Sequence, residues 1–261
     1  MLEHTFVHIP GVGAVTERAL WDQGVVTWAD AIDLGACPVG FSDARWGQSC
    51  RFIEDSLRSL QRHDHRHFAT SLPTSEHWRA YRDFRHSTAY LDIETTGCHR
   101  SSQVTVVGLY DGRRTRTFIA GDNLDQFPEV LDQYAMIVSF NGSSFDLPYL
   151  RRSFPDLPGG HLHLDLMHAL RRLGLKGGLK AIERHLGIER DDDLAGLDGW
   201  DAVRLWREYQ RGNAASLDTL VRYNAADIEN LELLAERAYA GVRASMGLPC
   251  DASGEGAGAC E

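Results

Sequence analysis

The spacing of hydrophobic positions divides the chain into a helical first third and a mixed remainder. Residues 6–32 combine a Pro-Gly-Val-Gly turn with apolar positions at helical spacing, which predicts a turn, a helix, a second turn and a second helix. Residues 41–67 continue at helical period, and Ser75, which follows Pro73, is a candidate N-cap for a further helix. The section before residue 87 is therefore expected to be all-helical.

The pattern changes to strands after this section. Residues 88–96, 103–112 and 114–121 are rich in β-branched and aromatic residues, and Asp111-Gly112 is typical of a hairpin turn. We expect three adjacent antiparallel strands here.

Strands and helices then alternate. A helix around 123–134, an apolar strand at 135–140, a helix from Ser144 and a short strand near 161–166 are predicted. Such alternation is typical of strands added in parallel to a sheet, so the fold class is α/β. The later segments are helical in period, up to a glycine-rich end that is expected to be disordered.

Composition and charge exclude several classes of protein. The 261 residues are 43% hydrophobic, enough to bury a sizeable core, and the net charge of −10 argues against coating nucleic acid by bulk attraction. No apolar run is long enough for a membrane span and Met1 to His8 do not resemble a signal peptide, so a cytoplasmic protein is expected. The 5 cysteines are scattered without a CxxC pair, which favours reduced thiols.

Two carboxylates lie on the first strand of the mixed section. Asp92 and Glu94, in "YLDIETTG", are two residues apart and so point to the same side of a sheet. Like charges this close need a cation to compensate for their burial. Taken alone, however, an Asp-x-Glu pair fits a solvated strand edge better.

Further acidic positions strengthen the case for a metal centre. Asp146 stands at the start of a helix, where free backbone N–H groups and the helix macrodipole favour an anion, although it could merely cap that helix. Tyr223 and Asp227 lie four residues apart on one helical face, which alone fits an ordinary amphipathic surface. Together, the four carboxylates suit two divalent ions ~3.5 to 4 Å apart, as in phosphoryl displacement. Oxygen ligands favour Mg²⁺ or Mn²⁺.

The segments "DIET", "NGSSFD" and "YNAAD" resemble the three motifs of DnaQ-like DEDD exonucleases, which are ribonuclease H-like. The tyrosine four residues before the last aspartate resembles the DEDDy branch, and "GGLKAIERHLGI" and "GWDAVRLW" resemble the YprB-like group. The resemblance implies that Asp92, Glu94 and Asp227 ligate metal. It also implies that Asp146 supports the second ion through water and that Tyr223 orients the attacking water.

The same resemblance implies a fold and an activity. The fold is a five-stranded mixed sheet flanked by helices, and the activity is metal-dependent 3′-to-5′ exonuclease cleavage. We expect a helical nucleic-acid-binding domain at 1–70, a linker helix at 71–86, the nuclease domain at 87–240 and a disordered tail at 241–261. A non-catalytic nucleic-acid-binding adaptor and a structure-specific endonuclease remain alternatives. No sequence feature indicates a protein partner.

The glycine turn near the N-terminus resembles a helix-hairpin-helix, a motif that presents backbone N–H groups to DNA phosphates. Gly11 and Gly13 would permit the close approach, Thr16 would add a hydroxyl contact, and this motif favours DNA over RNA. An ordinary helix-helix turn is the alternative. Lys180, which follows a Gly-Gly turn, is a candidate phosphate contact or a solvated lysine. Asp165 is assigned to a helix N-cap, outside the catalytic set.

Overall fold

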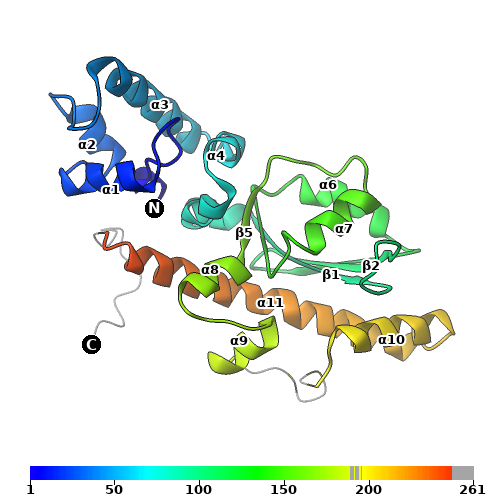
Figure 1. The fold of residues 1–261 in the computed structure, drawn as a ribbon. Helices are drawn as coiled ribbons and strands as arrows, with labels where there is room; N and C mark the ends of the chain where they lie inside the picture. Colours follow the sequence, from blue (N-terminus) through cyan, green and yellow to red (C-terminus); the bar gives the residue numbers. More distant parts are fainter. Residues whose placement is uncertain (189–190, 192–193, 195, 249–261) are drawn as a thin grey trace.

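The computed structural model describes residues 1–188, 191, 194 and 196–248, and it is built around one mixed sheet (Figure 1). The sheet has five strands in the order β3-β2-β1-β4-β5. The strands are β1 Thr88–Thr95, β2 Val104–Tyr110, β3 Thr115–Ile119, β4 Met136–Ser139 and β5 Leu162–Asp165. This architecture confirms the expected α/β class and the five-stranded mixed sheet.

Strand direction follows from the connections. β1 pairs with β2, and β2 with β3, in antiparallel register. In the turn between β2 and β3, the Asp111 carboxylate accepts hydrogen bonds from the backbone N–H groups of Arg113 and Arg114. Helical crossovers lead into β4 and β5; β4 pairs in parallel with β1, and β5 pairs in parallel with β4. Every residue of β4 and β5 is buried, as expected for parallel strands covered on both faces.

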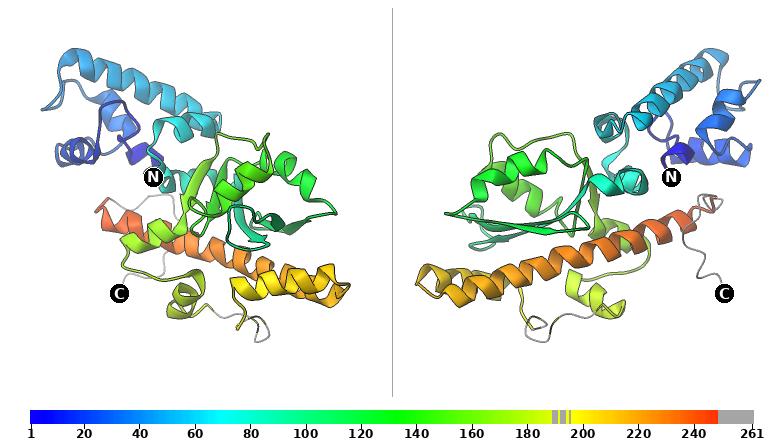
Figure 2. Two further views of the ribbon diagram at one scale, coloured as in Figure 1. Left: turned by 45° about the vertical axis from the view of Figure 1, so that its right-hand side comes forward. Right: turned by 180° about the vertical axis from the view of Figure 1, so that it is seen from behind.

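Helices cover both faces of the sheet (Figures 1 and 2). One face packs against the long helix α11, and Tyr90 shares the core of this face with Leu231 and Leu234 of α11. The other face, which includes Leu91, packs beneath α6 and α7. The helices are α6 Phe127–Leu131, which follows the short 3₁₀ helix η4 Leu124–Gln126, α7 Asp146–Ser153, α8 Leu166–Arg172, α9 Leu179–His185, α10 Gly199–Gln210 and α11 Ala214–Ser245.

The N-terminal region is helical, as expected, but its end differs from the expected single linker helix. It comprises η1 Leu2–His4, α1 Ala14–Asp22, α2 Trp28–Asp33, α3 Asp43–Gln61, α4 His65–Ser71, η2 Thr74–Ala80, α5 Tyr81–Phe84 and η3 Arg85–Ser87. Ser75 is not an N-cap, because it lies inside η2, whose N-cap is Pro73 and has no side-chain capping bond. Proline has no side-chain acceptor for the first free N–H groups, and the segment forms short turns instead.

A buried ion pair attaches the first helices to the rest of the molecule. Glu17 on α1 and Arg79 on η2 are 1% and 2% exposed, and their side chains meet in two hydrogen bonds of 2.9 and 3.0 Å. Glu17 also accepts from the backbone N–H groups of Phe6 and Val7. Removal of one member of such a pair costs about 3–5 kcal/mol because the other charge stays buried. One continuous hydrophobic core joins this region to the sheet.

Helix α11 extends further than the sequence predicted. Residues 241–245, expected to begin a disordered tail, form its last turn and bury Val242. Arg18 on α1 donates a hydrogen bond to the carbonyl of Met246, just beyond the helix end. Of the predicted tail, residues 249–261 lie outside the described residues. Among the helices of the described residues, none has the length and apolar character that a bilayer crossing requires.

Buried histidines should make the fold sensitive to acid. Burial lowers the pKa of His8 to about 3, and its ring packs 5.1 Å from that of Trp28. Between pH 3 and 6.5 the unfolded chain binds a proton at this position that the folded chain does not, so stability falls as the pH falls. The loss is about 1.4 kcal/mol per pH unit.

His8→Phe should therefore flatten the dependence of unfolding free energy on pH between 6 and 5, measured by urea denaturation. Other titrating groups are common to both proteins and cancel in the comparison. Equal slopes for the two proteins would contradict a neutral, buried His8.

Candidate active site

Three carboxylates converge between β1 and α11. Leu91 and Ile93 face the core beneath α6 and α7, so the alternation of β1 directs Asp92 and Glu94 towards α11. Asp227 projects from α11 to meet them, and ligand oxygens of the three residues lie within 4.8 Å of one another. The sequence-based expectation that these three side chains come together agrees with this placement.

Asp146 lies beside this triad, at the first turn of α7. Its Oδ1 accepts a hydrogen bond from the backbone N–H of Ile93 at 3.2 Å, and the residue is 2% exposed. The position of Asp146 requires Gly142, because a Cβ there would lie 2.0 Å from Ser139 Oγ and 3.5 Å from Asp146 Oδ2. The carboxylate thus bonds to the neighbouring strand and is not the N-cap of α7, which is Phe145.

The electrostatics of the cluster favour a bound cation. Burial, followed by repulsion from the other carboxylates, raises the pKa of Asp92 and of Glu94 well above the usual range. Burial also raises the pKa of Asp146 to about 7. Glu94 Oε1 is buried and has no hydrogen-bond partner among the described residues. Buried carboxylate oxygens without hydrogen-bond partners are suitable ligands for divalent metal ions, which are hard cations that take oxygen ligands.

Asn224, which the sequence analysis did not select, positions Asp92. Its Nδ2 donates a hydrogen bond of 2.9 Å to Asp92 Oδ2, and the residue is 1% exposed. Gly108 pairs with Asp92 across β1 and β2, and a Cβ at Gly108 would lie only 1.9 Å from Asn224 Oδ1. A glycine within a buried strand was the available signal, since it often marks a close approach of another group.

Lys180 lies against Tyr223, at the edge of the carboxylate cluster. Its Nζ donates a hydrogen bond of 2.8 Å to the Tyr223 hydroxyl and is 4.2 Å from the centre of that ring. It also bonds to the carbonyl of Leu197. The Gly-Gly turn holds Lys180 at the start of α9, with Gly178 as the N-cap and Gly177 at a φ of +116°. Lys180 is therefore a neighbour of the tyrosine. Burial and the nearby carboxylates raise the pKa of Glu94, and the positive charge of Lys180 opposes this rise without outweighing it.

Asp165 has the capping role expected for it. As the N-cap of α8 it accepts from the backbone N–H of Met167 at 3.1 Å. It also accepts from the backbone N–H groups of Asn141 at 2.8 Å and Ser143 at 3.1 Å. These bonds hold the loop that leads to Asp146.

A cleft of about 360 Å³ opens onto the carboxylates. It contains Asp92, Glu94, Tyr223 and Asp227. The other residues that line it are Ile93, Thr95, Cys98, Phe145, Asp198, Gly199, Trp200 and Val203. The carboxylates thus line an open cleft although they are largely buried.

The N-terminal turn lies apart from this cleft. Gly11 has a φ of +78°, and its carbonyl accepts from Arg45 at 2.7 Å. Gly13 is the N-cap of α1 with open space beside it, and Thr16 is half-buried. The helix that follows the turn, α1, contacts the chain at Met246, just after the end of α11. Asp227 is 19 positions earlier in the chain, which corresponds to about 28 Å along the helix axis. The turn is therefore distant from the carboxylates.

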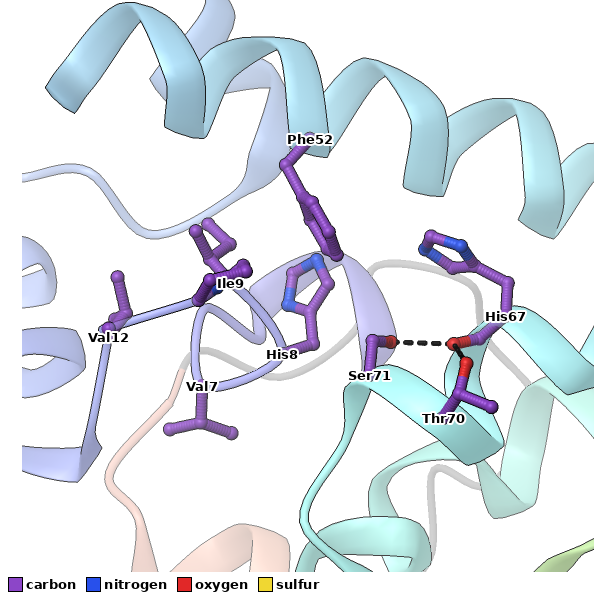
Figure 3. A pocket seen from close by; sticks show the side chains of 10 residues that line it. Val7, His8, Ile9, Val12, Phe52, His67, Thr70 and Ser71 are labelled. Atoms are coloured by element: carbon purple, nitrogen blue, oxygen red, sulfur yellow. Dashed lines mark hydrogen bonds between the residues drawn. The ribbon is translucent and has the colours of Figure 1, made fainter. Parts of the chain in front are cut away.

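A cavity of about 490 Å³ borders the same turn (Figure 3). His8 and Phe52 lie side by side in it, and the hydroxyls of Thr70 and Ser71 both donate to the carbonyl of His67. These hydroxyls are engaged within their own helix. The cavity therefore combines apolar side chains with two histidine rings, and neither ring nitrogen of the buried His8 has a hydrogen-bond partner among the described residues.

A family model described as the RNase_H superfamily matches residues 89–239, more than half of the chain. The family B DNA polymerase from the hyperthermophilic archaeon Pyrobaculum calidifontis is similar in structure, with 20% sequence identity and a TM-score of 0.48. The match covers 57% of this chain and 24% of the polymerase, so it spans about a quarter of that protein. Among curated proteins, no sequence matches this chain.

A divalent ion should stabilise the protein, and more so at higher pH. Because the pKa values of these carboxyl groups are raised in the folded protein, the folded protein binds protons that the unfolded chain does not. The stability that this protonation provides is lost as the pH rises through those pKa values. A bound cation offsets that loss and competes with protons for the same oxygens. At 100 times its dissociation constant, Mn²⁺ should raise Tm by about 5 to 10 °C at pH 8 and less at pH 6.

Thermal unfolding in Mn²⁺ and in EDTA measures this shift. Asp92→Asn should abolish it, whereas Asp218→Asn, an exposed position on α11, should retain it. An undiminished shift in the Asp92→Asn protein would contradict metal binding at the cluster.

Proposed function

Because the chain belongs to the RNase H superfamily, we propose that it is a metal-dependent nuclease that hydrolyses phosphodiester bonds. More specifically, we assign it a DEDDy-type 3′-to-5′ exonuclease activity, with DNA favoured as the substrate. The observation that carries the proposal is the convergence of Asp92, Glu94 and Asp227 within 4.8 Å at the floor of an open cleft.

The carboxylates would hold Mg²⁺ or Mn²⁺. Asp92, Glu94 and Asp227 are the direct ligands, and Asp146, fixed to the backbone of Ile93, supports a second ion from outside the triad. When bound, two such ions activate a water molecule and stabilise the leaving oxygen. Burial of Glu94, Asp146 and Asp227 beside the half-buried Asp92 is costly without a cation, which disfavours a non-catalytic adaptor that has no use for the metal.

Tyr223 and Lys180 would act on the attacking water. Tyr223 borders the cleft, and its hydroxyl accepts a hydrogen bond from Lys180 Nζ at 2.8 Å, which positions it. In that position it can donate a hydrogen bond to the water and hold it for in-line attack on phosphorus. The bond from the water oxygen to phosphorus would form as the bond from phosphorus to the 3′ oxygen breaks; the water would lose a proton to solvent, and the leaving 3′ oxygen would take one up to give a 3′ hydroxyl and a nucleoside 5′-monophosphate.

The N-terminal turn would bind DNA at a position distant from the cleft. The positive φ of Gly11 and the open space at Gly13 allow a phosphate to approach the backbone, as in a helix-hairpin-helix. The buried pair Glu17–Arg79 fixes this turn relative to the nuclease fold, so binding and cleavage would occur at a set separation.

The catalytic assignment is tested with purified protein, Mn²⁺ or Mg²⁺, and 5′-labelled single-stranded and duplex DNA and RNA. Asp227→Asn should lower the rate at least 100-fold, since even outer-shell changes at metal sites cost about 10 to 100-fold. Tyr223→Phe should lower kcat about 100-fold through loss of water positioning. Asp218→Asn and Tyr209→Phe, at positions that do not border the cleft, serve as matched controls.

The pattern of products separates the activities. A ladder shortening from the 3′ end, lost in EDTA, supports the exonuclease, whereas discrete internal cuts would indicate an endonuclease. Bound but uncut substrate in every metal would indicate an adaptor. Full activity of Asp227→Asn would contradict the assignment of the metal site.

Substitution of the turn glycines tests the DNA-binding assignment. Gly11→Ala introduces a side chain at a left-handed φ, and Gly13→Asp introduces a negative charge at the proposed phosphate contact. Both should weaken binding of a long duplex, measured by fluorescence anisotropy, while turnover of a short oligonucleotide changes little. Unchanged duplex affinity in Gly13→Asp would assign the turn a structural role alone.

A further inference from the structure

The cavity beside the N-terminal turn has no role in the proposed nuclease chemistry. Its volume is about 490 Å³, and it lies between the loop 7–12, Phe52 on α3 and the last turn of α4 (Figure 3). A cavity of this size that combines apolar walls with a few polar groups is typical of a site for one small organic group.

Aromatic rings form part of the cavity wall. The ring centre of Phe52 is 5.6 Å from that of His8 and 5.6 Å from that of His67. Phe52 is only half-buried, so part of its ring is open to the cavity. Such rings provide a surface on which another flat ring can stack.

His8 supplies hydrogen-bonding groups that the fold does not use. Burial lowers its pKa to about 3, so the imidazole is neutral and has one N–H donor and one bare nitrogen. Neither nitrogen has a partner among the described residues, which is unfavourable for a side chain that is 3% exposed. The last side-chain torsion of histidine has a broad energy minimum, so a small rotation would turn the edge of this ring towards a ligand.

His67 adds a hydrogen-bond acceptor. The Ser56 hydroxyl donates its only proton to the carbonyl of Phe52 at 2.9 Å, so it accepts from His67 Nε2, also at 2.9 Å. Burial lowers the pKa of His67, which favours the neutral ring with its proton on Nε2 and leaves Nδ1 as an acceptor. Donors and acceptors beside aromatic rings complement the edge and the faces of a nucleobase.

A phosphate-binding surface adjoins the cavity. Gly11 belongs both to the glycine turn and to the cavity wall. The exposed guanidinium of Arg45 donates a hydrogen bond of 2.7 Å to the Gly11 carbonyl, so a positive charge lies beside the turn. Guanidinium groups are strong hydrogen-bond donors to phosphate. A nucleotide whose phosphate lies at Arg45 and the turn would therefore have its base next to the cavity.

We infer that this cavity binds one unstacked nucleobase of a DNA strand whose phosphate lies on the glycine turn. The inference rests on the DNA-binding role proposed for the turn and adds the form of DNA that the turn prefers. A base inside a duplex has both faces covered by its neighbours, and it must leave the stack before it can enter the cavity. Duplexes that contain an unpaired nucleotide are then preferred over fully paired ones.

The test measures binding of the full chain to three labelled DNA duplexes by fluorescence anisotropy. One duplex is fully paired, one has a single unpaired nucleotide within one strand, and the third has an abasic nucleotide at that position. EDTA is present, so the result is independent of metal-dependent cleavage. The wild type should bind the duplex with the unpaired base about tenfold more tightly than the abasic duplex, which is the affinity that one base–aromatic stack supplies.

Variants of the cavity should remove this preference. Phe52→Leu keeps an apolar side chain without a flat ring, and Thr70→Trp, at an exposed position on α4, fills the cavity. Both should bind the unpaired and abasic duplexes equally and leave the affinity for the paired duplex unchanged, whereas Phe52→Trp should keep the preference. Phe154→Leu, which alters a half-buried phenylalanine that does not line the cavity, is the matched control and should behave as the wild type does.

The three duplexes also separate this inference from the proposed function of the turn. Equal binding of the unpaired and abasic duplexes by the wild type, or a preference that persists in both Phe52→Leu and Thr70→Trp, would overturn the base site. If the paired duplex binds and Gly13→Asp weakens that binding, the proposed role of the turn stands even where the base site fails. If no duplex binds, both fail.

A free nucleotide is the other source of the same chemistry. Thymidine 5′-monophosphate is titrated while the imidazole NMR signals of His8 and His67 are followed, and the duplex with the unpaired base is titrated in parallel. The duplex should saturate these signals at a much lower concentration, because the mononucleotide lacks the flanking phosphates. Saturation by the mononucleotide at an equal or lower concentration would overturn a DNA strand as the source of the base.

Discussion

Mutual repulsion among buried carboxylates is the constraint around which the rest of this structure is arranged. Asp92 and Glu94 share one side of β1, Asp227 reaches them from α11, and all three are brought within 4.8 Å. The surrounding contacts oppose this repulsion only in part, through a hydrogen bond from Asn224 to Asp92 and the positive charge of Lys180. The remaining electrostatic cost is the property that a divalent cation would remove, and it connects the fold to phosphodiester chemistry.

Backbone features far apart in the sequence make the cluster possible. Gly108 leaves the space that Asn224 fills, and Gly142 allows the loop before α7 to approach Ser139, which brings Asp146 to the backbone of Ile93. Asp165 ties that loop to the end of β5. Through Glu17 and Arg79 the same rigidity reaches the N-terminal helices, so the glycine turn is part of one body with the nuclease fold.

The amino-acid sequence was informative where the signal is local. Alternation along β1 and the four-residue spacing of Tyr223 and Asp227 predict the directions of those side chains, and Asp111-Gly112 predicts the hairpin. Asn224 was missed because Gly108, which leaves the space for its side chain, is distant in sequence. The role of either residue becomes evident only from their contact in the fold. Lys180 was expected to contact solvent or phosphate, but the packing of α9 places it on Tyr223. The turns of 71–86 follow tertiary packing of Trp78 and Arg79, which helical period does not reveal.

The central claim is that the buried carboxylates form a metal centre, and diffraction from crystals grown in Mn²⁺ tests it most directly. Data collected near the manganese absorption edge should show anomalous density between Asp92, Glu94 and Asp227, with a second peak towards Asp146. That density should be lost in crystals of Glu94→Gln. Absence of manganese density from the cluster in well-ordered wild-type crystals would contradict the account.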